Sequence, residues 1–162
     1  KGLSVLVEAF ARLDVEGELW IAGTGPDTAR LTAETAHDHP IRWLGRVTDE
    51  VKFARLRSAE VFCAPSLGGA SFGVVLIEAM AAGTTVVASG LDGYRNVATD
   101  ERDALLSAPG DVDELVVSLR RALSDSTLTA SLRDAGGQRA EEFAMSALAD
   151  RYVEIYHDLA RT

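Results

Sequence analysis

The sequence has little cysteine, little histidine and no long hydrophobic run. Its single cysteine, Cys63, excludes an internal disulfide and a cysteine-rich metal site. The three histidines, His37, His39 and His157, show no spacing typical of metal ligands, so no metal site is predicted. No apolar stretch approaches the roughly 20 residues that span a bilayer, and no signal-peptide pattern opens the chain.

Positive charge is also scarce. The 162 residues carry 16 Lys and Arg against 25 Asp and Glu, a formal net charge of −9. This balance argues against nucleic acid as a partner and against a basic membrane-docking face within these residues. No Gly-x-Ser-x-Gly elbow and no Ser/His/Asp arrangement can be read either. What remains is a composition ordinary for one soluble α/β domain with a proper core.

Short apolar strands alternate with amphipathic helices along the chain. Strands are predicted at 19–22, 41–44, 61–64, 85–89 and 104–106. Helices are predicted at 3–13, 27–37, 48–58, 71–83, 111–123, 127–135 and 147–160, with a turn-rich link at 90–96 and a break at Gly136-Gly137. This order predicts a doubly wound parallel sheet, covered on both faces, over residues 1–162. We expect its first strand to be missing before residue 3.

Ligands of such folds bind at the carboxyl ends of the strands. Gly23-x-Gly25 follows the first predicted strand and invites a nicotinamide-cofactor interpretation. That fingerprint needs a third glycine, where this chain has Thr28, and an acid about 20 residues later, which is absent. A tight turn between strand and helix is the better interpretation, and no cofactor is predicted.

The predicted helix at 71–83 is apolar apart from one acid, Glu78. Ser71 is a plausible N-cap and Gly83 a plausible C-cap. The backbone N–H groups at the helix start, those of Phe72, Gly73, Val74 and Val75, favour a phosphate. Seven residues make nearly two helical turns, so Ser71 and Glu78 are expected on one face, where the carboxylate could accept from both hydroxyls of a ribose. The alternative is that Glu78 pairs with an arginine and merely closes the core.

These segments together resemble the C-terminal half of retaining GT-B glycosyltransferases of group 1 (family 4), a Rossmann-like domain. The matching pieces are Lys1-Gly2, Gly23-x-Gly25-Pro26, Leu44-Gly45-x-Val47, Ala64-Pro65-Ser66 and the run from Ser71 to Gly83. Within the family, the segments 46–52, 68–73 and 86–92 are most similar to phosphatidylinositol mannosyltransferases. The resemblance implies that residues 1–162 form one nucleotide-sugar-binding domain, the N-terminally truncated part of a two-domain protein.

The resemblance also implies roles for the matched positions. Lys1 would contact the donor diphosphate, the N–H groups of residues 72–75 its distal phosphate, and Glu78 the ribose. Val47 would meet the base through its backbone, with Asp49 and Lys52 beside it. An acid at the base edge could accept from the N1–H and amino group of guanine, which favours GDP-mannose. Lys52 alone is more often a solvated helix lysine, and a UDP-sugar donor remains the alternative.

One residue departs from the family pattern. Ala70 occupies the position of the first glutamate of the E-x7-E region, which in the family contacts the donor sugar. Alanine cannot accept those hydrogen bonds, and losing such a contact commonly costs a few kcal/mol in the transition state. No catalytic residue is therefore assigned. The alternative hypothesis is a catalytically weakened nucleotide-binding or regulatory module.

The family resemblance implies sugar transfer with retention, without a metal and without a cofactor. The acceptor, a phosphatidylinositol-like lipid or another glycan, would bind largely to the absent N-terminal domain, which would also make any membrane contact. A cytoplasmic location, peripheral at the inner membrane face in the longer protein, is expected from the donor chemistry. The fragment alone is expected to bind nucleotide weakly and to transfer nothing.

Overall fold

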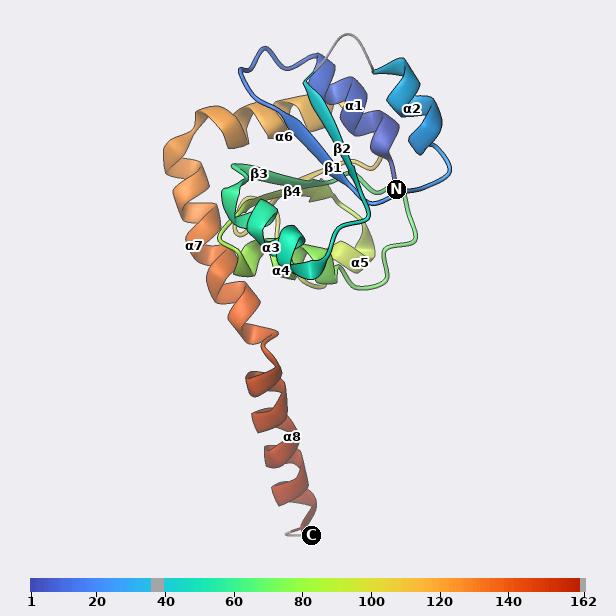
Figure 1. Ribbon diagram of the computed structural model, residues 1–162. Coiled ribbons are helices and arrows are strands. Elements are labelled where there is room, and N and C mark those ends of the chain that lie inside the picture. Colours follow the sequence, from blue (N-terminus) through green and yellow to red (C-terminus); the bar gives the residue numbers. More distant parts are fainter. Residues whose placement is uncertain (36–39, 161–162) are drawn as a thin grey trace.

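Parallel strands and helices alternate through most of the computed structural model, which describes residues 1–35 and 40–160 (Figure 1). The strands are β1 (Leu19–Ala22), β2 (Ile41–Gly45), β3 (Val61–Ala64), β4 (Thr85–Ser89) and β5 (Leu105–Ser107). The helices are α1 (Leu3–Ala11), α2 (Thr28–Glu34), α3 (Asp49–Ser58), α4 (Val74–Ala81), α5 (Asp92–Arg95), α6 (Val112–Ser124), α7 (Ser126–Glu142) and α8 (Met145–Ala160). The predicted α/β class is confirmed.

The strands form two parallel sheets. β1 pairs with β2, whereas β3, β4 and β5 form a second sheet in that order. β4 is buried at every residue, as its continuous β-branched run predicts for the centre of a parallel sheet. The strand predicted at 104–106 lies one residue later, where Leu105 faces Val87 of β4.

Both faces of the β3–β4–β5 sheet are covered by helices. Alternate strand residues point to opposite sides. Val86 and Leu106 join a core with Leu76 and Met80 of α4. A second core, on the other face, combines strand residues with α1 and α6 and contains Leu6, Ala9, Val87, Leu105, Leu115 and Leu119. The sheet is therefore doubly wound.

The helix predicted at 71–83 begins later than expected. α4 starts at Val74, and its N-cap is Gly73 in a left-handed conformation with φ 100° rather than Ser71. A Cβ at Gly73 would lie 3.0 Å from both Tyr94 and Val97, so tertiary packing fixes this start. The predicted cap at Gly83 is confirmed: its φ is 77°, and its N–H donates to the carbonyl of Met80.

The predicted break at Gly136-Gly137 is wrong. α7 continues through both glycines from Ser126 to Glu142. A Cβ at Gly136 would lie 3.2 Å from Cγ of Met80, so this glycine lets α7 approach α4 closely. Packing between helices thus outweighs the low helix propensity of glycine.

Smaller differences occur at three other elements. α2 begins at Thr28, which leaves Pro26 outside the helix, and the predicted helix end at His37, together with His39, lies outside the described residues. The link predicted at 90–96 contains the short helix α5. α8 extends away from the rest of the fold (Figure 1). No helix of the described chain is long and apolar enough to cross a membrane.

Candidate functional site

Two helices begin at the carboxyl ends of strands and bring the predicted site residues to one rim. α3 follows β2 after a short loop, and α4 follows β3 after a longer loop at 65–73. Thr48 caps α3 by accepting a hydrogen bond from the Val51 N–H. Asp49 and Glu50 lie in the first turn of α3, where the helix dipole favours negative charge.

A lysine of α3 meets the lone acid of α4. Nζ of Lys52 donates to Oε1 of Glu78 at 2.8 Å and lies 3.1 Å from Oδ1 of Asp49. The Lys52 and Glu78 side chains are 29% and 26% exposed, so the pair is accessible from solvent. The hydrogen bonds to Glu78 and then Asp49 raise the pKa of Lys52 above its ordinary value, because they favour the ammonium form. Glu78 thus has a cationic partner, but it is a lysine and not an arginine.

The first turn of α4 offers free backbone donors beside this pair. In the described part of the chain, the N–H groups of Val74 and Val75 have no acceptor, whereas the N–H of Leu76 donates to the Gly73 carbonyl. Val74 and Val75 precede Glu78 by four and three residues, which places them on the same side of the helix as Glu78, with backbone positions about 6 and about 4.5 Å away along its axis.

Two predicted site residues lie before the helix and its N-cap, Gly73. Ser71 and Phe72 belong to the preceding loop and are exposed, so the prediction that Ser71 shares a helical face with Glu78 is wrong. The physical reason is the left-handed Gly73, which interrupts the helical path between them. The Phe72 ring packs edge-on against Phe143 with centroids 5.7 Å apart.

The loop before α4 is held in place by α5, which sequence reasoning missed. Tyr94 and Ser66 are both buried, and their hydroxyl oxygens lie 3.0 Å apart in a hydrogen bond. A Cβ at Gly93 would lie 1.9 Å from the carbonyl oxygen of Ala70, so only glycine permits this approach. The sequence predicted only a turn-rich link at 90–96, whereas Gly93 of this link allows close packing against the loop.

Ala70 lies half-buried in that loop and packs against the core that contains α4. Its methyl group offers no hydrogen-bond acceptor to a ligand. The loop therefore has no carboxylate at position 70, where the resemblance predicts one.

Lys1 and Val47 lie at the same rim but apart from the ion pair. Gly2 abuts the loop after β3, since a Cβ there would lie 1.9 Å from the Pro65 carbonyl oxygen, and Lys1 is exposed beside it. Val47 is half-buried directly before the α3 cap. Within the described residues, no hydrogen bond or ion pair links either residue to Lys52 or Glu78. The structure thus brings Asp49, Lys52 and Glu78 into contact and places the others around them.

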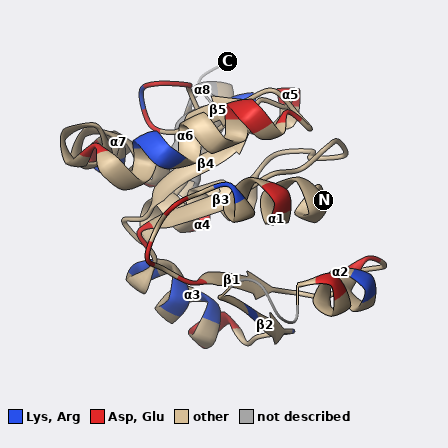
Figure 2. Ribbon diagram, turned by 90° about the horizontal axis from the view of Figure 1, so that it is seen from above, with Lys and Arg blue, Asp and Glu red and all other residues tan. Residues whose placement is uncertain are grey.

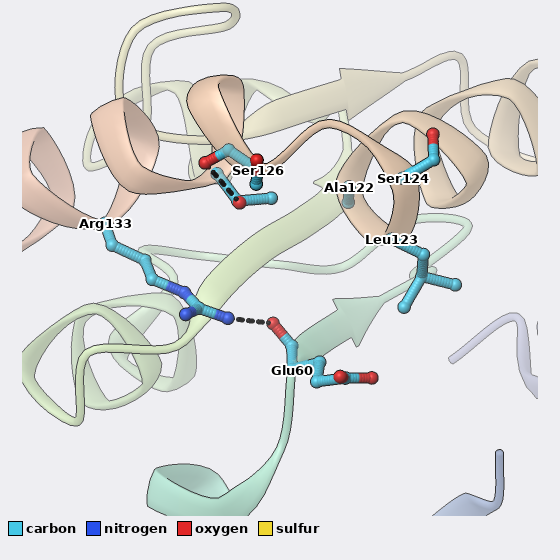
Figure 3. A pocket seen from close by; sticks show the side chains of 7 residues that line it. Glu60, Ala122, Leu123, Ser124, Ser126 and Arg133 are labelled. Carbon is cyan, nitrogen blue, oxygen red and sulfur yellow. Dashed lines mark hydrogen bonds between the residues drawn. The ribbon is translucent and has the colours of Figure 1, made fainter.

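A hollow at the amino end of β3, opposite the rim, is lined by residues that the sequence analysis did not predict as site residues (Figure 3). Its lining includes Glu60, which directly precedes β3, and the segment that joins α6 to α7. Arg133 donates there to the Glu60 carbonyl at 3.0 Å and to Oγ1 of Thr85 at 2.9 Å. Arg133 thus forms hydrogen bonds with groups of the protein itself. We therefore interpret the hollow as part of the packing between α7 and the sheet rather than as a second ligand site.

The described residues contain no group of three His, Cys, Asp or Glu side chains placed to hold a metal ion. The groups available at the rim for binding a ligand are therefore backbone amides, the ammonium groups of Lys1 and Lys52, and carboxylates, among them those of Asp49 and Glu78. Amides and an ammonium bind anions, whereas a half-buried carboxylate binds hydroxyl or amino donors.

Comparison with known proteins identifies the family to which these strands and helices belong. The family of group 1 glycosyl transferases matches residues 1–125, which include β1 to β5 and both helices of the ion pair. The chain belongs to this family. A phosphatidyl-myo-inositol mannosyltransferase of Mycolicibacterium smegmatis is 38% identical over 99% of this chain.

Solved structures place the chain in the GT-B fold. The sucrose-phosphate synthase of Thermosynechococcus elongatus superposes with a TM-score of 0.85 over 99% of this chain at 28% identity. The Anabaena protein HepE, solved with UDP-glucose, superposes with a TM-score of 0.83 over 98% of this chain at 20% identity, which shows the fold alone. The chain covers 42% of the M. smegmatis relative, 43% of the synthase and 45% of HepE.

Proposed function

We propose that this chain is the donor-binding part of a retaining mannosyltransferase that uses GDP-mannose. One observation carries the proposal: free N–H groups at the start of α4 lie one helical turn from the accessible carboxylate of Glu78. An anion site next to a hydroxyl-binding site matches a nucleoside diphosphate, in which a diphosphate adjoins a ribose. The name of the M. smegmatis relative supports mannose as the sugar.

In this proposal, the N–H groups of Val74 and Val75 receive the distal phosphate, and Lys1 adds a positive charge beside the diphosphate. Glu78 accepts from the ribose hydroxyls. Its Oε1 is engaged by Lys52, whereas its Oε2 accepts no hydrogen bond within the described residues. The ribose can therefore bind without breaking the ion pair.

The base would lie against the loop before α3. Val47 contacts it through the backbone, and the Asp49 side chain, which is 86% exposed and lies beside Lys52, turns toward it. A carboxylate can accept two hydrogen bonds from the N1–H and amino group of guanine, whereas uracil presents a different edge. Asp49 is thus the residue that favours GDP over UDP.

The rate enhancement would come from stabilising the leaving diphosphate. Its developing charge meets the α4 amides and Lys1, so no metal and no side-chain nucleophile on this chain is required. The acceptor, a phosphatidylinositol-like lipid or another glycan, binds largely outside these residues, in a further domain that also makes any contact with the inner face of the cytoplasmic membrane. The 162 residues alone then bind the donor weakly and transfer nothing.

Calorimetric titration of the chain with GDP, UDP and ADP tests the donor proposal. We expect GDP to bind most tightly of the three. Glu78→Gln should lower the affinity for GDP about tenfold or more, since a hydrogen bond to a charged group contributes roughly 1.5–3 kcal/mol. Glu141→Gln on the exposed face of α7 is the matched control and should leave binding unchanged. Preference for UDP would overturn the mannose assignment, and equal loss in both variants would overturn the role of Glu78.

Ala70 favours a second candidate function, a nucleotide-binding module with weakened transfer. Ala70→Glu in the longer protein distinguishes the two. If the missing carboxylate limits catalysis, transfer from GDP-mannose should rise at least tenfold while GDP affinity stays the same. Ala70→Gln controls for the added bulk, and an unchanged rate in both variants would favour the binding module.

A further inference from the structure

The last turns of α7 meet the segments that support the start of α4. α7 carries arginine side chains that hydrogen-bond with backbone carbonyls of other segments (Figure 2, Lys and Arg in blue). One of them, Arg139, lies beyond residues 1–125, the part of the chain that the family matches. Its Nε donates to the Val97 carbonyl at 3.1 Å, and its Nη2 donates to the Asn96 carbonyl at 2.9 Å. Asn96 is the C-cap of α5, so Arg139 satisfies carbonyls at the end of that helix.

Through Val97, this contact reaches the start of α4. Val97 is fully buried, and a Cβ at Gly73 would lie 3.0 Å from its Cγ2 atom. Gly73 is the left-handed N-cap of α4, and its carbonyl accepts from the N–H groups of Leu76 and Ile77. The position of Val97 therefore limits where Gly73 can lie and, with it, how the first turn of α4 is placed.

A second series of contacts runs from the same arginine to the residue before Gly73. The guanidinium of Arg139 lies over the Phe143 ring, 4.8 Å from its centroid. Phe143 in turn packs edge-on against Phe72, with centroids 5.7 Å apart. Two separate series of contacts from one side chain thus end on adjacent residues, Phe72 and Gly73, directly before the first turn of α4.

We propose that Arg139 is a positioning residue of the donor site, which acts through Val97 and Phe143 on the first turn of α4. This inference rests on the proposed function, in which the free N–H groups of Val74 and Val75 receive the distal phosphate. Arg139 itself touches no part of the donor. It holds the amides in the arrangement that binds the phosphate, so that little ordering is needed when the donor arrives.

The geometry requires an arginine at this position. All three nitrogens of the guanidinium are engaged, since Nη1 donates to the carboxylate of Glu142. A lysine ammonium is a point charge and cannot hold two carbonyls and a ring in one fixed plane. Burial raises the pKa of the Asp103 carboxyl, whereas the hydrogen bond from the Thr99 N–H and the charge of Arg139 act in the opposite direction. Arg139→Lys therefore keeps this charge and removes the planar fork.

Arg139→Lys and Arg133→Lys form a matched pair on one helix. Arg133 also makes two hydrogen bonds, to the Glu60 carbonyl and to Oγ1 of Thr85, but at the amino ends of β3 and β4. A merely structural role of either arginine would lower the stability of the fold in both variants. A positioning role predicts that only Arg139→Lys changes the start of α4.

Amide hydrogen exchange of the longer protein without ligand is the first measurement. Arg139→Lys should speed exchange of the Leu76 and Ile77 amides about tenfold, because both donate to the Gly73 carbonyl, and Arg133→Lys should leave them unchanged. The β4 amides should stay protected in both variants, which shows that both fold. Phe143→Leu interrupts the second series of contacts alone and should speed the same two amides. Equal exchange of these amides in the two lysine variants would overturn the proposal.

Calorimetric titration of the longer protein with GDP is the second measurement. Arg139→Lys should bind GDP about tenfold more weakly than the unsubstituted protein, since amides that must first be ordered bind less tightly, whereas Arg133→Lys should bind it equally well. Unchanged GDP affinity in Arg139→Lys would overturn its role in donor binding. Absence of GDP binding to the unsubstituted protein would instead contradict the proposed function. The exchange of the Leu76 and Ile77 amides would then decide by itself whether Arg139 fixes the start of α4.

Discussion

At the scale of single residues, the partner of Glu78 decides what the site can do. An arginine could grip both carboxylate oxygens through its planar fork, whereas a lysine ammonium acts as a point charge. Lys52 contacts Oε1 alone, and it also lies beside Asp49. The pair therefore compensates the carboxylate and still leaves it able to accept from a ligand.

Cys63 provides a test of burial at the residue scale. Desolvation raises the pKa of its thiol to about 12, because the apolar surroundings disfavour the thiolate. At pH 8 its thiolate fraction should be roughly a thousandfold below that of a free cysteine with its pKa near 8.5. We expect reaction with a disulfide reagent to be correspondingly slow in the folded chain and ordinary in urea. Rapid labelling of the folded protein would contradict this.

At the scale of elements, glycines set how closely helices and loops approach. Gly73 fixes the start of α4, Gly93 fits α5 onto the loop before it, and Gly136 brings α7 against Met80. In each case a Cβ would meet an atom of another element within 3.2 Å. The rim is therefore shaped by packing between elements rather than by the propensity of each one.

The two adjacent glycines of α7 allow a matched comparison. A Cβ at Gly137 would meet no atom of another element within 4 Å, so Gly137→Ala should stabilise the fold by about 0.5–1 kcal/mol through helix propensity. Gly136→Ala should raise the free energy of unfolding by less, or lower it, because the added Cβ would press on Met80. Urea unfolding of both variants measures the difference. An equal gain at both positions would show that the α7–α4 contact does not require glycine.

At the scale of the whole molecule, α8 stands apart from the folded body (Figure 1). The exposed fractions of Met145, Tyr156 and Leu159 are 77%, 67% and 68%, so these side chains contribute little to the core. The two cores lie within residues 3–143. The stability of this chain thus rests on α1 to α7 and the sheets.

Deleting residues 146–162 should therefore change the free energy of unfolding by less than about 0.5 kcal/mol. Leu132→Ala serves as the positive control, because Leu132 of α7 is 1% exposed and its truncation should cost about 2–5 kcal/mol. Urea unfolding measures both changes. A loss from the deletion close to that of the control would mean that α8 supports the fold directly.

The order of strands and helices, the apolar core positions and the need of Glu78 for a polar partner could be predicted because each depends on local pattern. Periodicity marks which residues are buried, and an acid in an apolar helix needs a partner. The segments 64–83 and 44–47 also carried the family resemblance, which the match over residues 1–125 confirmed.

The tertiary structure decided what depends on contacts between distant segments. Sequence pattern could not show that Lys52, 26 residues before Glu78, is its partner, nor that Gly73 rather than Ser71 caps α4. It also could not show that the described strands divide into a β1–β2 sheet and a β3–β4–β5 sheet, since strand order follows from the path of the crossovers. Local propensity sets the conformation that each segment prefers, whereas packing between segments selects where an element begins and which residues it contacts.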